Sequence, residues 1–166
     1  LGAVDCLAKP ATGGPNAFDE LAEKVKLAAQ SRPRARPAAR EAAARPTKAY
    51  APDGRILAIG SSTGGVEALM TIVAHLPENC PPTVITQHMP ATFTKSFAKR
   101  LDASSTASVA EAEDGAPMEP GKVWLAPGGG RHLTVERSGG VLRCRLREGA
   151  PVNGHSPSVD VLFDSM

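Results

Sequence analysis

Two apolar runs joined by one amphipathic segment constrain the fold of this chain more than any other feature. The first run, residues 55–59, leads into a turn of small residues, and the second, residues 82–89, is stopped by a proline. Between them, apolar side chains recur at helical spacing over residues 66–76. Two buried strands joined by such a helix lie parallel in one sheet. The sequence therefore predicts an α/β fold with a doubly wound, mainly parallel, Rossmann-like sheet.

After this βαβ unit the chain changes to short apolar runs separated by turn residues. Ser138, Gly139 and Gly140 are typical of a tight hairpin turn between the last two runs. We expect the runs to form an antiparallel hairpin excursion with a structural role: residues 107–112, 122–126, 132–137 and 141–146.

The small-residue turn holds a serine at the spacing of a nucleophile elbow. Gly60, Ser62 and Gly64 fit the G-x-S-x-G pattern, in which small neighbours let the backbone bend and expose the serine oxygen. Two alternatives share this turn: a simple helix N-cap, and a phosphate- or nucleotide-binding module that uses the backbone N–H groups of residues 60–65. A Walker loop is excluded, because residues 66 and 67 are valine and glutamate where that loop needs lysine followed by serine or threonine.

His88 ends the second apolar run, and we expect it beside Ser62. Because the carboxyl ends of parallel strands meet at one edge of a sheet, the two side chains emerge together. An imidazole that titrates near neutrality accepts the proton of a serine hydroxyl, which is otherwise a poor nucleophile. The sequence places the other three histidines less favourably for this role: His75, His132 and His155.

Three segments along the chain carry a family resemblance. They are IGSSTGG at residues 59–65, ITQHMP at 85–90 and PSVDVLF at 157–163. Together they resemble the catalytic domain of the chemotaxis protein-glutamate methylesterases, the CheB family. The resemblance runs from about residue 55 to the last residue, because further segments fit it as well: residues 93–101, 112–115 and 124–128.

The resemblance implies a serine hydrolase that demethylates glutamate γ-methyl esters on methyl-accepting chemoreceptors, often with a second activity that deamidates receptor glutamines. It makes Ser62 the nucleophile and His88 the general base, and it places Thr63 in the active-site turn. The family's third triad residue is an aspartate in a later Gly-Met-Gly-x-Asp-Gly segment, which the 166 residues do not contain. We therefore expect this aspartate beyond the end of the chain, and almost no activity from the chain alone.

The amino end resembles a different domain. Residues 2–10 are similar to the last strand of a response-regulator receiver, and Lys9 matches the lysine that contacts the phosphoryl group. Phe18, Leu21 and Val25 give one apolar face that resembles the receiver's final helix. From this resemblance we expect the part of the receiver that a chemotaxis histidine kinase phosphorylates to lie upstream of residue 1.

The expected organisation is that of a truncated, internal piece of a longer protein. An apolar stripe of helical spacing, residues 159–166, continues to the last residue without a stop signal, and the first residue is not methionine. We expect three parts: a receiver remnant at 1–30, a basic linker rich in alanine, proline and arginine at 31–54, and the incomplete amino-terminal part of the catalytic domain at 55–166.

Composition bears on the partners and the compartment. Basic residues concentrate in the linker without an aromatic platform, which argues against nucleic-acid binding. No apolar run approaches the roughly 20 residues of a membrane span. The 3 cysteines show neither a C-x-x-C nor a metal-ligand pattern. We expect a cytoplasmic protein with reduced thiols, no membrane insertion, no metal and no cofactor.

Overall fold

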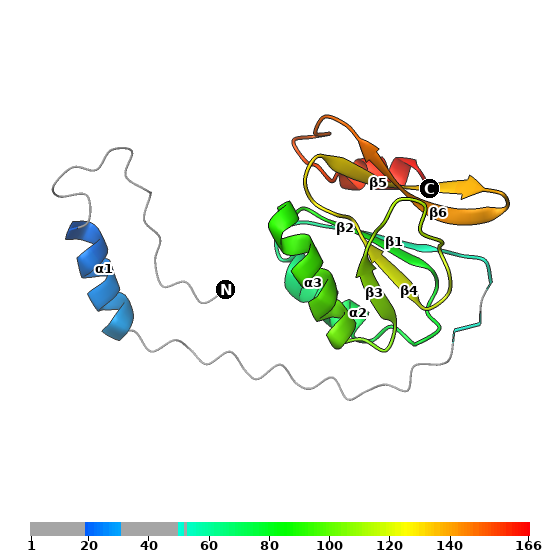
Figure 1. Ribbon diagram of the computed structural model, residues 1–166. Coiled ribbons are helices and arrows are strands. Elements are labelled where there is room, and N and C mark those ends of the chain that lie inside the picture. Colours follow the sequence, from blue (N-terminus) through cyan, green and yellow to red (C-terminus); the bar gives the residue numbers. More distant parts are fainter. Residues whose placement is uncertain (1–18, 31–49, 52) are drawn as a thin grey trace. The chain divides into compact units, whose positions relative to one another are not determined.

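The computed structural model describes residues 19–30, 50–51 and 53–166 (Figure 1). The chain divides into two compact units, Leu1–Ala43 and Ala44–Met166. In the first unit, α1 (Asp19–Gln30) forms where the sequence predicts a helix. Its apolar side chains Leu21 and Val25 are 43% and 57% exposed. The predicted receiver lysine, Lys9, and most of the predicted linker lie outside the described residues.

A four-stranded parallel sheet forms the centre of the second unit (Figure 1). The strand order is β1-β2-β4-β3, and each neighbouring pair is parallel. The mainly parallel sheet that the sequence predicts is confirmed. Its strands are β1 (Leu57–Ser61), β2 (Thr83–Gln87), β3 (Ser108–Glu111) and β4 (Lys122–Leu125).

Helices α2 (Gly65–Val73) and α3 (Ala91–Ala103) cover one face of this sheet. The apolar stripe of the sequence runs on to Leu76, but α2 ends at Val73. Beyond it, the N–H groups of His75 and Leu76 bond to carbonyls three residues back, in a tighter turn. The proline at position 77 contributes to this ending, because it has no N–H to donate to the carbonyl of Val73, four residues back.

The other face carries the hairpin of β5 (Arg131–Ser138) and β6 (Val141–Glu148), together with α4 (Val159–Asp164). The predicted two-residue turn is present: Gly139 and Gly140 have φ of 57° and 81°, which favours glycine. Alternation along β2 divides the core between the two faces. Ile85 packs with α2 and α3, whereas Val84 packs with the hairpin and α4.

The expectation that residues 107–112 and 122–126 belong to the antiparallel excursion is wrong. They form β3 and β4, which pair in parallel within the main sheet. No helix joins these two strands. The connection instead runs along β6, where the N–H of Met118 bonds to the carbonyl of Leu142 and that of Cys144 to the carbonyl of Ala116. The sequence therefore lacks the helical crossover signal that normally marks a parallel pair.

None of the helices in the described ranges has the length and apolar composition of a membrane-spanning segment. Cys80 and Cys144 are buried and free, whereas Cys6 lies outside the described residues. Burial raises the pKa of the Cys144 thiol to about 12.

Candidate active site

Ser62 and His88 meet at the carboxyl edge of the sheet. Their strands are in register from Leu57 opposite Thr83 to Ser61 opposite Gln87, so each residue is the first beyond its strand. The N–H of His88 bonds to the carbonyl of Ser61 at 3.1 Å, which extends this register. His88 Nδ1 lies 3.2 Å from Ser62 Oγ. The sequence predicts this meeting, and the distance allows proton transfer between the two groups.

The turn after β1 presents the serine to solvent. Ser62 and Thr63 are both exposed, and Gly64 adopts φ of 79°, a left-handed conformation that glycine tolerates. The N–H of Gly65 then closes the turn on the carbonyl of Ser62, at 2.8 Å. Helix α2 begins at this point, so the serine stands between a strand end and a helix start.

Gln87 cross-links the ends of β1 and β2 through its side-chain amide. The sequence analysis did not identify it as a site residue. The side chain is 4% exposed. It accepts a hydrogen bond from Ser61 Oγ at 2.7 Å and donates from Nε2 to the carbonyls of Ser62, at 3.0 Å, and His88, at 3.2 Å. One amide thus links the backbone of both candidate catalytic residues. A polar residue at the end of a buried apolar strand was the available signal.

Gly65 is required beside this amide. A Cβ at this position would overlap Gln87 Oε1 and would lie 2.7 Å from Ser61 Cβ. Gly65 is also buried at the first turn of α2. Its lack of a side chain therefore lets Gln87 reach between the two strand ends, which is a packing reason for glycine rather than a conformational one.

The imidazole of His88 lies in an environment that favours its neutral form. Burial lowers its pKa below the usual 6.5, the nearby His155 lowers it further, and Asp160 opposes both effects. Its second nitrogen, Nε2, is buried without a hydrogen-bond partner among the described residues. A neutral imidazole close to a serine hydroxyl has the protonation state that a general base needs.

The other histidines occupy three different environments. His75 is exposed on the turn after α2, with Nδ1 2.7 Å from the carbonyl of Thr71. His132 is buried in β5, with both ring nitrogens in hydrogen bonds to backbone. His155 was expected to be less favourably placed than His88 for the role of general base. It stacks directly on His88, with ring centroids 3.6 Å apart. Stacking of distant loops has no signature in residue spacing.

An apolar cavity of about 360 Å³ opens beside His88. It extends from the carboxyl end of β2 across the first turn of α2 and along α3 as far as Arg100, and Phe93 in it is 58% exposed. Its lining residues are Val66, Gln87, His88, Met89, Pro90, Phe93, Ser96, Phe97 and Arg100.

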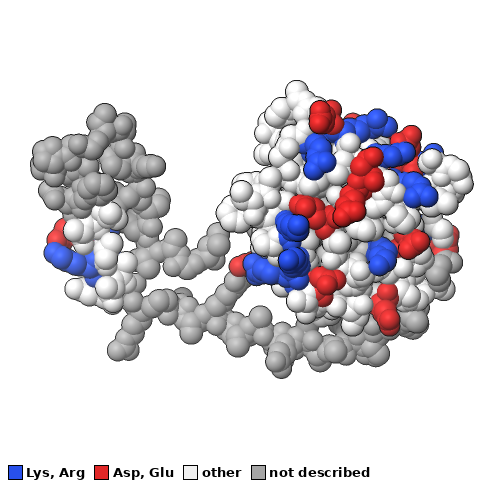
Figure 2. Space-filling model, viewed as in Figure 1, with Lys and Arg blue, Asp and Glu red and all other residues white. Residues whose placement is uncertain are grey.

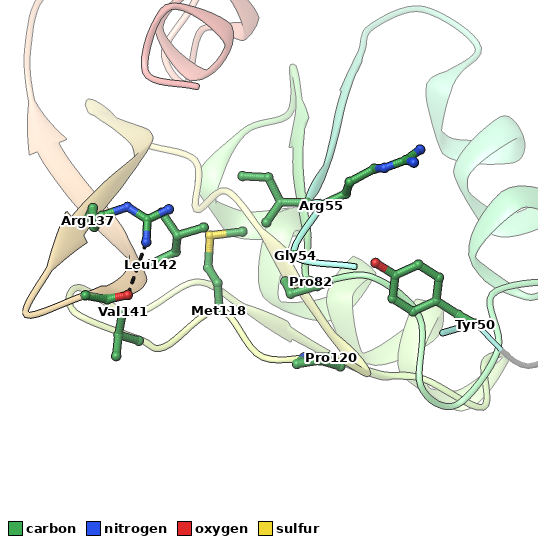
Figure 3. A pocket seen from close by; sticks show the side chains of 11 residues that line it. Tyr50, Gly54, Arg55, Pro82, Met118, Pro120, Arg137, Val141 and Leu142 are labelled. Atoms are coloured by element: carbon green, nitrogen blue, oxygen red, sulfur yellow. Dashed lines mark hydrogen bonds between the residues drawn. The ribbon is translucent and has the colours of Figure 1, made fainter. Parts of the chain in front are cut away.

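A second cavity, of about 400 Å³, lies at the opposite edge of the sheet (Figure 3). Ile56 and Pro82, which precede β1 and β2, contribute to it together with Met118 and the tip of the hairpin. There Arg137 donates a hydrogen bond to the carbonyl of Gly140 at 3.1 Å. This cavity contains neither Ser62 nor His88, so it is separate from the candidate active site.

The surface chemistry of the second unit is mixed. On the face shown in Figure 2, basic and acidic side chains alternate without a broad area of one sign. Among the ion pairs of this unit, Arg145 pairs with both Asp114 and Glu136. In the described ranges no group of three or more histidine, cysteine, aspartate or glutamate side chains is arranged to hold a metal ion. The clearest chemistry is therefore that of Ser62 and His88.

A family model described as CheB methylesterase matches residues 57–166, the segment that contains the sheet, the hairpin and both candidate catalytic residues. The chain belongs to the CheB methylesterase family. The resemblance stated from the sequence motifs is thereby confirmed.

Curated CheB-family relatives extend the match to the whole chain. A protein-glutamate methylesterase/protein-glutamine glutaminase 1 of Caulobacter vibrioides is 62% identical over 170 residues, covering 100% of this chain and 49% of the relative. A Rhizobium etli protein-glutamate methylesterase/protein-glutamine glutaminase is 56% identical over 167 residues and is covered to 48%. The chain spans about half the length of the curated relatives it matches.

A solved CheB structure shows the same fold. The Thermotoga maritima CheB methylesterase catalytic domain is 44% identical, with a TM-score of 0.65, over 69% of this chain and 60% of that chain. The parallel sheet with an added antiparallel hairpin is thus the arrangement of a CheB catalytic domain.

Proposed function

We propose that this chain supplies the nucleophile and the general base of a protein-glutamate methylesterase acting on chemoreceptors. The observation that carries the proposal is the 3.2 Å contact between Ser62 Oγ and His88 Nδ1 in a member of the CheB family. The alternative, a phosphate- or nucleotide-binding module at residues 60–65, gives no role to an imidazole held against the serine.

The proposed reaction is a two-step ester hydrolysis. His88 takes the proton of Ser62 as Ser62 Oγ attacks the carbonyl carbon of the γ-methyl ester on a receptor glutamate. The tetrahedral intermediate then breaks its bond to the methoxy group, which leaves as methanol with the proton from His88. Water, deprotonated by His88, next attacks the carbonyl carbon of the acyl-serine. The bond from that carbon to Ser62 Oγ then breaks, His88 returns the proton to Ser62, and the glutamate is released. Backbone N–H groups at Ser62 and Thr63 are the proposed donors to the negative oxygen of each intermediate.

Deamidation is the same acyl transfer with a different leaving group. The attack of Ser62 on a receptor glutamine would release ammonia instead of methanol, and the same acyl-serine would follow. The names of the Caulobacter and Rhizobium relatives include both activities. We propose that one site performs both reactions.

A carboxylate beyond residue 166 is proposed to complete this site. Nδ1 of His88 accepts a proton only when Nε2 carries the ring hydrogen, and that buried N–H then needs an acceptor. Two further buried polar atoms lack partners in the described part of the chain, Thr86 Oγ1 and Ser156 Oγ, and both belong to the segments that flank His88 and His155. An added polar segment at this place would satisfy them.

The proposed aspartate would select the base form of His88 and stabilise the imidazolium that forms during attack. In serine proteases, disabling the corresponding aspartate lowers kcat by about 10⁴-fold. We therefore propose that residues 1–166 alone have almost no esterase activity, and that the full-length protein is the active form.

Residues 1–30 are proposed to be the end of a receiver domain, with Lys9 at its phosphoryl site. Matches to relatives of about twice this length cover the whole chain, including the residues before 57 that the family model leaves out. A chemotaxis histidine kinase is the partner that this assignment implies, and the cytoplasm is the proposed compartment. The segment between residues 31 and 54 is proposed as the linker.

Serine-directed labelling tests the proposed chemistry against the binding-module alternative. A fluorophosphonate should form one adduct, located on Ser62 by peptide mass spectrometry, and faster in the full-length protein than in this chain. Ser62→Ala should remove the adduct and His88→Ala should slow its formation by about 10²–10⁴-fold. Ser138→Ala, at an exposed serine of the hairpin turn, is the matched control. The absence of an adduct in the full-length protein would refute the proposal.

A further inference from the structure

His155 covers one face of the candidate base. The two rings have centroids 3.6 Å apart and planes inclined by 11°. In this nearly parallel stack the N–H bonds of both rings lie in their own planes, so neither ring donates a hydrogen bond to the other. The contact therefore acts through ring packing and charge, not through proton transfer between the imidazoles.

The loop that carries His155 is anchored at both ends by His132. Nδ1 of this buried ring accepts the N–H of Ser158 at 3.1 Å, so Nε2 carries the ring hydrogen and donates it to the carbonyl of Ala150, also at 3.1 Å. Gly149 lies against the same ring, because a Cβ there would be 3.2 Å from His132 Cδ2. One side chain of β5 thus fixes where the loop leaves the hairpin and where it enters α4.

Within the loop, His155 closes a tight turn. Its N–H and carbonyl both bond to Val152, at 3.0 and 3.1 Å. Asn153 has φ of 51° and donates from its side chain to Asp160 of α4 at 2.8 Å. The backbone position of His155 is therefore set by hydrogen bonds within the loop and to two neighbouring elements, although the residue is exposed.

The stack restricts His88 in the way that proton transfer needs. Rotation of the His88 ring about its bond to Cβ would carry Nδ1 away from Ser62 Oγ, and a ring packed flat on one face opposes that rotation. His155 and Asp160 are the groups whose charges act on His88 from the loop and from α4. From α3, Arg100 lines the same cavity as His88.

We propose that His155 is a positioning residue for His88: its stacked ring keeps the candidate base facing Ser62. The same neighbour adds to the lowering of the His88 pKa, which burial mainly causes. The assignment of His88 as the base rests on the proposed function. The stacking and its effect on the titration of His88 do not depend on it.

The first experiment follows the four histidine rings of this chain by NMR, with His155→Ala, His155→Phe and the exposed-site control His75→Ala. Stacking should shift the His88 ring protons upfield in the wild type and in His155→Phe, and His155→Ala should abolish that shift. The pKa of His88 should rise in both His155 variants, because both remove the imidazole charge, and should stay unchanged in His75→Ala. An unshifted His88 ring in the wild type, or an unchanged pKa in His155→Ala, would overturn the proposal.

The second experiment measures the fluorophosphonate labelling rate of Ser62 in the full-length protein against pH. His155→Ala should lower the rate about tenfold, the range open to the loss of one stacked aromatic contact, whereas His155→Phe should keep most of it. In His155→Phe the midpoint of the pH profile should move up with the pKa of His88. If both variants lose the same fraction of the labelling rate and the midpoint of the pH profile does not move, His155 has only a structural role in the loop and the proposal is overturned.

Failure of the proposed function gives a different pattern. If Ser62 remains unlabelled in the wild-type full-length protein, the hydrolase assignment fails, while the ring shifts and the pKa of His88 still decide whether His155 positions that ring.

Discussion

The side-chain amide of Gln87 donates a hydrogen bond to the backbone carbonyl of Ser62 at 3.0 Å. The same nitrogen reaches the carbonyl of His88, and the amide oxygen accepts from Ser61. The two candidate catalytic residues are 26 positions apart in sequence, yet one buried group sets the distance between their backbones. The precision of the site therefore depends on a residue that takes no part in the proposed chemistry.

Gln87→Glu tests that dependence with little change of shape. A carboxylate still accepts from Ser61, but it cannot donate to the two carbonyls. We expect the free energy of unfolding to fall by about 1–3 kcal/mol, the usual cost of buried groups left without partners. Urea denaturation of this chain measures it, with Gln30→Glu on the exposed surface of α1 as the control. Equal stability of Gln87→Glu and the wild type would show that the amide does not hold the edge.

Gly60→Ala tests the packing of α4 on the end of β1. A Cβ at Gly60 would overlap Val159 Cγ1 and would lie 3.2 Å from Phe163 Cζ. We expect a loss of about 1–3 kcal/mol through overpacking. The double variant Gly60→Ala/Val159→Ala should recover part of that loss, because the second change removes the atoms that clash. Additive losses in a double-mutant cycle would contradict this explanation.

The depressed pKa of His88 predicts how stability depends on pH. The folded chain binds a proton at this ring less readily than the unfolded chain does, mainly because the ring is buried. Its contribution to stability is therefore present above about pH 6.5 and is lost as the pH falls through the lower folded pKa. Unfolding free energies between pH 7.5 and 5 should fall more steeply for the wild type than for His88→Gln. Identical slopes would contradict the prediction.

Asp114 should show the pH dependence of a carboxylate. The N–H of Leu146 lowers its pKa most, with help from Arg145. The stability that it contributes is present above its unfolded pKa of about 3.8 and is lost as the pH falls through the lower folded value. Asp114→Asn should therefore be destabilising at pH 7 and neutral near pH 2, in contrast to Asp164→Asn at an exposed position. If Asp114→Asn remains less stable than the wild type near pH 2, the loss of stability comes from the altered side-chain shape and not from the lost charge.

The sequence predicts those parts of the fold that local spacing encodes. The βαβ unit follows from apolar residues at helical spacing between two buried runs, and the hairpin turn follows from Gly139 and Gly140. The pairing of β3 with β4 was beyond such reasoning, because the connection between them has no helix and lies along β6. Helix α2 also ends earlier than its apolar stripe, and Pro77 contributes because it has no N–H to donate to the carbonyl of Val73.

Local sequence patterns likewise predict one part of the candidate site and not another. The meeting of Ser62 and His88 could be predicted, because each is the first residue after a parallel strand and such strands end at one edge of the sheet. Gln87 was missed although it carries a signal, because a polar residue that ends a buried apolar strand needs hydrogen-bond partners. His155 carries no such signal. It reaches the site through a loop whose anchor, His132, bonds to the backbone of residues 18 and 26 positions further along the chain. Contacts of that kind leave no periodicity in the sequence.

The most direct test of the central claim is the release of methanol from methylated chemoreceptor by the full-length protein and its Ser62→Ala variant. The account predicts turnover by the wild type and a loss of turnover to the detection limit in the variant, as when a serine protease loses its nucleophile at a cost of about 10⁶-fold. Circular dichroism should show the same fold for both proteins. Methanol release by Ser62→Ala at the wild-type rate would contradict the account.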